Sequence, residues 1–438
     1  MHDIDSALEV IRARDATAAR LANGLWGAMR TGAAHSRVTR YDVQGVCWGA
    51  LPLLARNPDS AVVMGDRHAA AAVLAELLEL LGYPHYADIC RGETTRRILD
   101  AAEDTEACTA LAAAAWQESG VQPPNTPALR WGEVRGPVEQ AVHAATGRIM
   151  EEAIASGGVD LDSPDAEVIR TALTMKLLGS PAEDLSGTWY SEIFDERLTT
   201  WLTYGGSQTR RELLVRVQPE VTQPPEPSPC DEFPALQTLL DACRGDGVRL
   251  TRNGYLPTAL VRELVGLMPA CADYPASGRG ESRWPPLLHL RQLAVELELL
   301  TRTGDRLLLA EPGREYVDDA SLLAMGVGER LVAKDTSARG VIQEVIFAAL
   351  LLEDVIELDR LLDKVAVVID EEGWGPNPRG LSTQELARDF GLLFLRWLHI
   401  VDALDADDEG LRVGLTTAGR AAARWGLRAR VMLREVPT

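Results

Sequence analysis

The chain has 438 residues, of which 46% are hydrophobic and 25% are charged, and its formal net charge is −21. This length exceeds one ordinary hydrophobic core, so we expect two or three domains, and the composition excludes both a disordered chain and a membrane-embedded one. The negative charge opposes attraction to a phosphate backbone, so any nucleic-acid contact would require a local basic patch.

The first residues, MHDIDSALEV, are acidic and lack the basic and apolar regions of a signal peptide. No apolar run approaches the length of a membrane span. The cysteines have no CxxC spacing, which is typical of reduced, buried thiols: Cys47, Cys90, Cys108, Cys230, Cys243 and Cys271. These features predict a cytoplasmic protein without a membrane partner.

Helical patterns dominate residues 1–217 and predict one mostly helical domain there. Apolar residues at three- and four-residue spacing predict a single long helix over residues 4–29. Residues 60–82 are typical of a short strand, a tight turn and a helix with Asp66 as its N-cap. Further helices are expected at 93–120 and 138–155.

Glu139 and His143 lie one turn apart on the last of these helices, a spacing that suits a metal pair or an ordinary solvated contact. A matching second pair is missing from the sequence. We therefore favour the solvated contact, and we predict no metal and no cofactor.

Aromatic residues concentrate at 189–204, where they form either a domain core or a candidate ligand pocket: Trp189, Tyr190, Phe194, Trp201 and Tyr204. The sequence contains no GxSxG, P-loop, dinucleotide or HExxH pattern, so no catalytic residue is assigned. An enzyme is the least favoured class, and this segment is its best candidate site.

A proline-rich stretch over 218–233 predicts a linker. Two related modules follow, at 234–335 and 336–438. In the first, a short strand at 248–251 and a helix from Pro286 precede a hairpin that turns at Thr303-Gly304-Asp305. In the second, Ser382 and Glu385 predict a capping box, and a hairpin turns near 407–410.

The two modules share short sequence patterns. Residues 290–293, LRQL, match 395–398, LRWL, and Gly313-Arg314 matches Gly419-Arg420. The expected fold is mostly α with small β-hairpins: a helical N-terminal domain followed by tandem winged-helix-like modules.

The runs LTRNGYLPTALVREL, LRQLAVELELL and LLLAEPGREY resemble the C-terminal region of a family of uncharacterised actinobacterial proteins grouped with the plasmid open-reading-frame-three proteins. The resemblance covers about residues 234–430. It implies a duplicated helical and winged architecture, and it assigns no functional residues.

Winged helices bind either DNA or protein. Four arginines are candidate phosphate contacts for DNA: Arg291, Arg302, Arg306 and Arg396. Glu296, Glu298 and Asp402 oppose that role by charge, so nucleic acid is disfavoured. Phe394 and Trp397 make the second module's third helix apolar, as expected of a protein-binding surface. The sequence thus favours a non-enzymatic protein-binding or regulatory protein, with a DNA-binding transcriptional regulator as the alternative.

Overall fold

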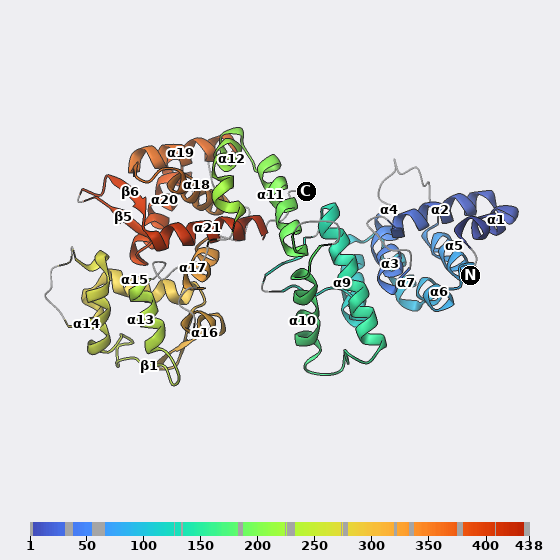
Figure 1. Ribbon diagram of the computed structural model, residues 1–438, viewed down its shortest axis with the longest axis horizontal. Helices are drawn as coiled ribbons and strands as arrows, with labels where there is room; N and C mark the ends of the chain where they lie inside the picture. The colour runs from blue at the N-terminus through green and yellow to red at the C-terminus, as the bar shows by residue number, and fades with distance from the viewer. Residues whose placement is uncertain are drawn as a thin grey trace. The chain divides into compact units, whose positions relative to one another are not determined.

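The computed structural model describes residues 3–432 except 31–37, 55–65, 127, 133–134, 183–186, 224, 226–232, 273, 275–278, 319–321, 333–336, 375–379 and 408. The described residues are mostly helical and form two three-stranded antiparallel sheets (Figure 1). The mostly α architecture with small hairpins is therefore confirmed.

The chain divides into two compact units, Met1–Glu196 and Arg197–Thr438. The division comes before the predicted boundary at 217, which lies inside the helix α12 (Gln208–Thr222). This helix packs against α18 (Ala338–Leu352) and α21 (Thr417–Met432), so it belongs to the second unit. Half of the predicted linker over 218–233, at 224 and 226–232, lies outside the described residues.

The first unit is built from helices: α1 (Ile4–Arg14), α2 (Ala16–Arg30), α3 (Arg40–Gln44), a π-helical turn (Gly45–Ala50), α4 (Leu51–Leu54), α5 (Arg67–Leu80), α6 (Pro84–Arg91), α7 (Glu93–Asp100), α8 (Thr105–Ser119), α9 (Pro137–Ala155), α10 (Ala166–Leu178) and the start of α11 (Trp189–Tyr204). The core of this unit gathers apolar side chains from α2 to α8, among them Leu51, Leu74, Leu78 and Ile98.

The prediction of a single helix over 4–29 is wrong, because the helix is interrupted at Asp15 and two helices, α1 and α2, form instead. This residue has an extended backbone, with φ −149° and ψ 108°. Its carboxylate accepts hydrogen bonds from the Thr17 and Ala18 backbone N–H groups at 2.8 and 3.1 Å, which caps α2. Asp66 caps α5 as predicted, by accepting from the His68 N–H at 2.9 Å, and the strand expected at 60–65 lies outside the described residues.

The second unit contains the same order of elements twice. The first set is α13 (Pro234–Ala242), β1 (Val248–Arg249), α14 (Thr258–Leu267), α15 (Pro285–Glu296), β2 (Leu300–Thr303), β3 (Arg306–Leu309) and α16 (Glu311–Asp318). The second set is α18, β4 (Ile356–Glu357), α19 (Leu358–Glu371), α20 (Thr383–Ile400), β5 (Leu404–Ala406), β6 (Arg412–Leu415) and α21. The strand orders β1-β3-β2 and β4-β6-β5 are the same, and α17 (Leu323–Leu331) lies between the sets and packs against α21.

The repeated glycines have the same structural role in both sets. A Cβ on Gly313 would meet the Leu299 carbonyl oxygen at 2.1 Å, and one on Gly419 would meet the Ala403 carbonyl oxygen at 1.9 Å. Each glycine therefore lets the helix after the hairpin touch the backbone just before the hairpin's first strand. The repeated Gly-Arg pair therefore marks a position where a backbone carbonyl lies too close for any side chain, so only glycine fits.

The sequence match of LRQL with LRWL is one residue out of register. Each third helix ends in an equivalent backbone bond: the Leu299 N–H donates to the Ala294 carbonyl, and the Ala403 N–H donates to the Leu398 carbonyl. This equivalence aligns Leu290 with Phe394, and both side chains are buried. The correction matters for function because it places Phe394 on the core side of its helix.

Candidate interaction surface

The exposed face of α20 is the strongest candidate for a contact with another molecule. Ser382 and Glu385 start the helix with the predicted capping box, and Gly391 lets it approach Leu362 of α19, where a Cβ would meet the leucine side chain at 2.7 Å. Leu392 and Leu393 on the opposite side are 37% and 41% exposed. The exposed residues of this face are Arg388, Asp389, Leu392, Leu393 and Arg396.

The third helices of the two sets lie against each other. Elements α15 and α20 are in contact, and an Nη2 of Arg396 lies 2.8 Å from Nδ1 of His289. Burial and the nearby Arg396 charge lower the pKa of His289, which favours a neutral ring that accepts this hydrogen bond. One side of each third helix is consequently covered by the other set.

The structure removes Phe394 from the predicted contact surface. Phe394 is 1% exposed and packs edge to face on Phe347, with ring centroids 5.1 Å apart, so it is a core residue. Trp397 is half-buried, and the guanidinium carbon of Arg339 lies 4.8 Å from the centre of its ring. The exposed apolar residues of this helix are instead Leu392 and Leu393.

The four candidate phosphate contacts lie in different environments. Arg291 is not available to a phosphate, because its side chain is largely buried and its Nε lies 2.6 Å from an oxygen of the fully buried Glu281. That carboxylate also accepts a hydrogen bond from the Leu256 N–H at 2.7 Å. Arg396 contacts His289, whereas Arg302 and Arg306 lie on the first hairpin, the former exposed and the latter half-buried.

A buried ionic network in the second unit was not predicted from the sequence. Glu344 of α18 is fully buried, and its oxygens lie 2.7 Å from Nε of Arg210, 3.1 Å from Nε of Arg430 and 3.3 Å from the indole nitrogen of Trp201. Burial alone would raise the pKa of Glu344, but the two guanidinium groups outweigh it and lower the pKa to about 2. The sequence feature that could have indicated this network is the glutamate inside the apolar run GVIQEVIFAALLL, because a charged residue buried in such a run needs a partner of opposite charge.

The aromatic residues at 189–204 do not share one environment. Phe194 is buried in the first unit and Trp201 in the second, while Tyr204 is 67% exposed. Trp189 and Tyr190 are half-buried. Trp201 donates to Glu344 and so has a structural role, and these side chains do not form the pocket considered from the sequence.

Glu139 and His143 were predicted to form a solvated contact, but both are buried. Glu139 accepts a hydrogen bond from the Gly132 N–H at 2.8 Å, and Nδ1 of His143 is hydrogen bonded to the Tyr41 hydroxyl. Burial lowers the pKa of His143 well below its ordinary value and raises that of Tyr41 to about 12. Within the described ranges, no group of three or more His, Cys, Asp or Glu side chains could hold a metal ion.

Among the residues that the structure describes, no helix has the length and apolar character needed to cross a membrane. No protein-family model, curated protein or solved structure matches the chain.

Proposed function

We propose that the chain is a non-enzymatic protein-binding protein whose second unit is a tandem of winged-helix-like modules. The duplicated order of helices and strands, with the same strand order in both sheets, supports the tandem. Because this scaffold serves more than one kind of partner, the choice between protein and DNA depends on the exposed side chains.

The observation that carries the proposal is the exposed pair Leu392 and Leu393 on the third helix of the second module. A helix that reads DNA presents hydrogen-bonding side chains to base edges, which leucine cannot do. Complete burial of a fully exposed leucine contributes about 1.5–3 kcal/mol, and because Leu392 and Leu393 are 37% and 41% exposed, each would contribute roughly 1 kcal/mol on contact with a protein partner. The contact between α15 and α20 further limits access to both third helices.

The charges beside the leucines define the partner's chemistry. Arg388 and Arg396 lie one turn before and one turn after the pair on the same face, together with the exposed Asp389, and Nη1 of Arg388 lies 3.6 Å from a carboxylate oxygen of Asp359. Complementary charge favours a polypeptide segment that presents apolar side chains flanked by aspartate or glutamate. The exposed charges of this face, two arginines and one aspartate, leave one excess positive charge in a chain of net charge −21.

A peptide array tests this assignment directly. The full chain is incubated with helical peptides that carry a constant apolar core and acidic, neutral or basic flanks. We expect retention of the acid-flanked peptides, and we expect the Leu392→Glu/Leu393→Glu variant to lose that retention. Val168→Glu, which changes a 68% exposed valine in the first unit, is the matched control and should bind like the wild type.

Two outcomes contradict the proposal. If the wild type and the double variant retain the acidic, neutral and basic peptides equally, the leucines do not select the partner. A shift of random DNA duplex at 50 mM salt or below that disappears steeply as salt rises would favour the DNA-binding alternative. Both leucines are exposed, so circular dichroism should show an intact fold in the double variant.

A further inference from the structure

The hairpin of the first module borders a hollow that the protein-binding surface does not use. Its volume is about 450 Å³, and it lies between the β2–β3 hairpin and the turn after β1. Three arginines line it, Arg249, Arg252 and Arg302, and Asp305 is the one acidic residue of the described lining. Three positive charges and one negative charge therefore surround the same space.

Backbone geometry holds one guanidinium in place over the turn. Gly254 has a φ of +77°, which favours glycine, and the guanidinium of Arg302 lies 3.4 Å from the position that a Cβ on Gly254 would take. The Thr251 and Gly254 backbones close this turn through a 2.8 Å hydrogen bond. Nε of Arg302 donates to the Gly304 carbonyl at 3.3 Å, which leaves its terminal nitrogens directed at the turn side of the hollow.

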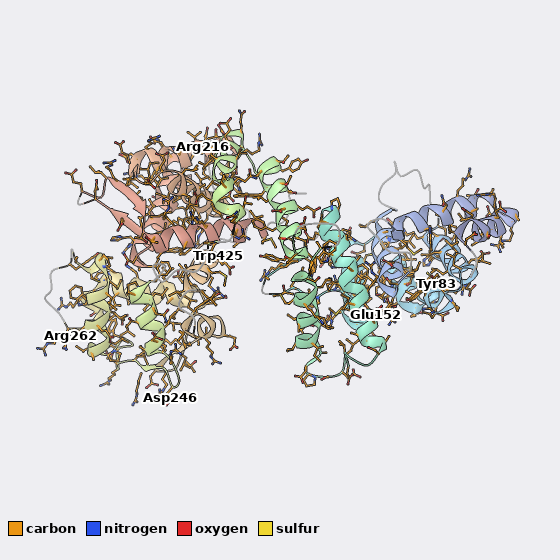
Figure 2. All side chains as sticks on the ribbon, in the orientation of Figure 1. Tyr83, Glu152, Arg216, Asp246, Arg262 and Trp425 are labelled. Carbon is orange, nitrogen blue, oxygen red and sulfur yellow. The ribbon has the colours of Figure 1, made fainter. Side chains whose placement is uncertain are left out.

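The three arginines differ in how their charge is balanced. Nε of Arg249 lies 2.8 Å from a carboxylate oxygen of Asp305, so this pair is neutral as a unit. Arg252 is exposed and has no hydrogen-bond or ion-pair partner among the residues that the structure describes. Arg306, just outside, donates to the backbone carbonyl of Asp246, which is labelled in Figure 2, at 2.6 Å. Arg252 and Arg302 thus supply an excess of two positive charges.

The geometry points to a binding site for a phosphomonoester dianion in this hollow. Guanidinium groups donate paired hydrogen bonds to phosphate oxygens, and two excess charges match the near-double charge of a phosphomonoester at neutral pH. The site lies on the first module, so it is independent of the leucine surface on the second.

The second module has lost the corresponding charges. In the strand ladders, Arg249 pairs with Arg306 and Arg302 with Leu307, while Glu357 pairs with Arg412 and Ala406 with Val413. Glu357 and Ala406 therefore occupy the places of Arg249 and Arg302. The second hairpin also carries Asp405, Asp407 and Glu409.

This asymmetry distinguishes a compact dianion from a nucleic acid. A phosphodiester chain would extend past the hollow towards the acidic side chains of a protein with net charge −21, which opposes binding of a polyanion. A single phosphate group occupies the hollow alone. The favoured ligand is consequently a phosphorylated side chain or a small phosphomonoester.

Ligand-observed ³¹P NMR of the full chain with O-phosphoserine, inorganic phosphate and a twelve-nucleotide single-stranded DNA tests the site. We expect saturable binding of O-phosphoserine that strengthens between pH 5 and pH 7.5, because the second phosphate pKa is about 6. Arg252→Ala and Arg302→Ala should each weaken it about tenfold, since charge-assisted hydrogen bonds are lost. Arg262→Ala removes an exposed charge from α14 outside the hollow and should leave the affinity unchanged; Arg262 is labelled in Figure 2.

Three results would overturn the assignment. They are no saturable binding of O-phosphoserine or phosphate by the wild type, equal weakening by Arg262→Ala and Arg252→Ala, or tighter binding of the oligonucleotide that O-phosphoserine cannot compete away. Binding of inorganic phosphate as strong as that of O-phosphoserine supports a site for the phosphate group alone, and stronger binding of O-phosphoserine supports a phosphorylated side chain. Among the described residues Arg252 has no hydrogen-bond or ion-pair partner, so the Arg252→Ala variant tests the site even if Arg302→Ala fails to fold.

Discussion

Glu344→Gln tests the buried network that joins α11 and α12 to the second module. The substitution preserves shape but removes the carboxylate charge that faces Arg210 and Arg430. Breaking a buried ion pair costs about 3–5 kcal/mol, because an uncompensated buried charge remains. Arg210 keeps a second carboxylate, Glu372, at 3.0 Å, so we expect the lower end, about 3 kcal/mol.

The pKa of Glu344 gives the same magnitude. A folded-state pKa of about 2, against an ordinary 4.5, corresponds to about 3 kcal/mol. Because the folded-state pKa is the lower one, this stabilisation is fully present above pH 4.5 and is lost as the pH falls towards 2. The glutamine variant should lack this part of the acid dependence.

Hydrogen exchange of the α18 amides reports on this unit alone. At pH 7 we expect exchange through opening of the unit to be faster by about a hundredfold in Glu344→Gln, as a loss of about 3 kcal/mol requires. The control is Glu263→Gln at an exposed position of α14, whose effect should stay within about 0.5 kcal/mol. A change in Glu344→Gln no larger than in this control would refute the reasoning.

Three further predictions follow from buried positions. Phe394→Ala should destabilise the second unit by about 3–5 kcal/mol in chemical denaturation. An unchanged free energy of unfolding would contradict the assignment of Phe394 to the core. Gly419→Ala should cost about 3 kcal/mol through the clash with the Ala403 carbonyl, whereas Gly266→Ala, with open space around it, should stabilise by about 1 kcal/mol. The first unit should lose thermal stability as the pH falls below about 6.5, because the lowered pKa of buried His143 keeps it neutral while the histidine of the unfolded chain is protonated. The His143→Gln variant should show a weaker dependence of thermal stability on pH. An unchanged dependence would exclude His143 as its source.

Local patterns in the sequence predicted much of the second unit. Turn glycines, the capping box of Ser382 and the apolar periodicity are short-range features, and they predicted the helix from Pro286, the start of α20 and both hairpins. The break at Asp15 was missed because an aspartate within an apolar period also fits an exposed helical position. The extended backbone at Asp15 lets α1 and α2 pack against each other, and this contact is not part of any local sequence pattern.

The candidate surfaces were harder to predict, because exposure depends on long-range packing. Phe394 was expected on a contact surface because it is apolar, but composition alone does not show which face of the helix packs into the core. The ion pair of Arg291 was not predicted because its partner, Glu281, lies ten residues earlier in a separate 3₁₀ turn, Glu281–Arg283. The hollow beside the first hairpin joins residues that are some fifty positions apart, and no local pattern links them.

The second unit is tied together across its two ends in the chain. The Arg197 guanidinium donates to the Met432 carbonyl, and that of Arg428 donates to the Val221 and Thr222 carbonyls at 2.6 and 2.9 Å. During synthesis, α11 and α12 leave the ribosome long before α21 supplies these partners. The first unit can therefore reach its native state early, while the second must wait for the final helix, and a ribosome that stalls late would leave Glu344 without one of its guanidinium partners.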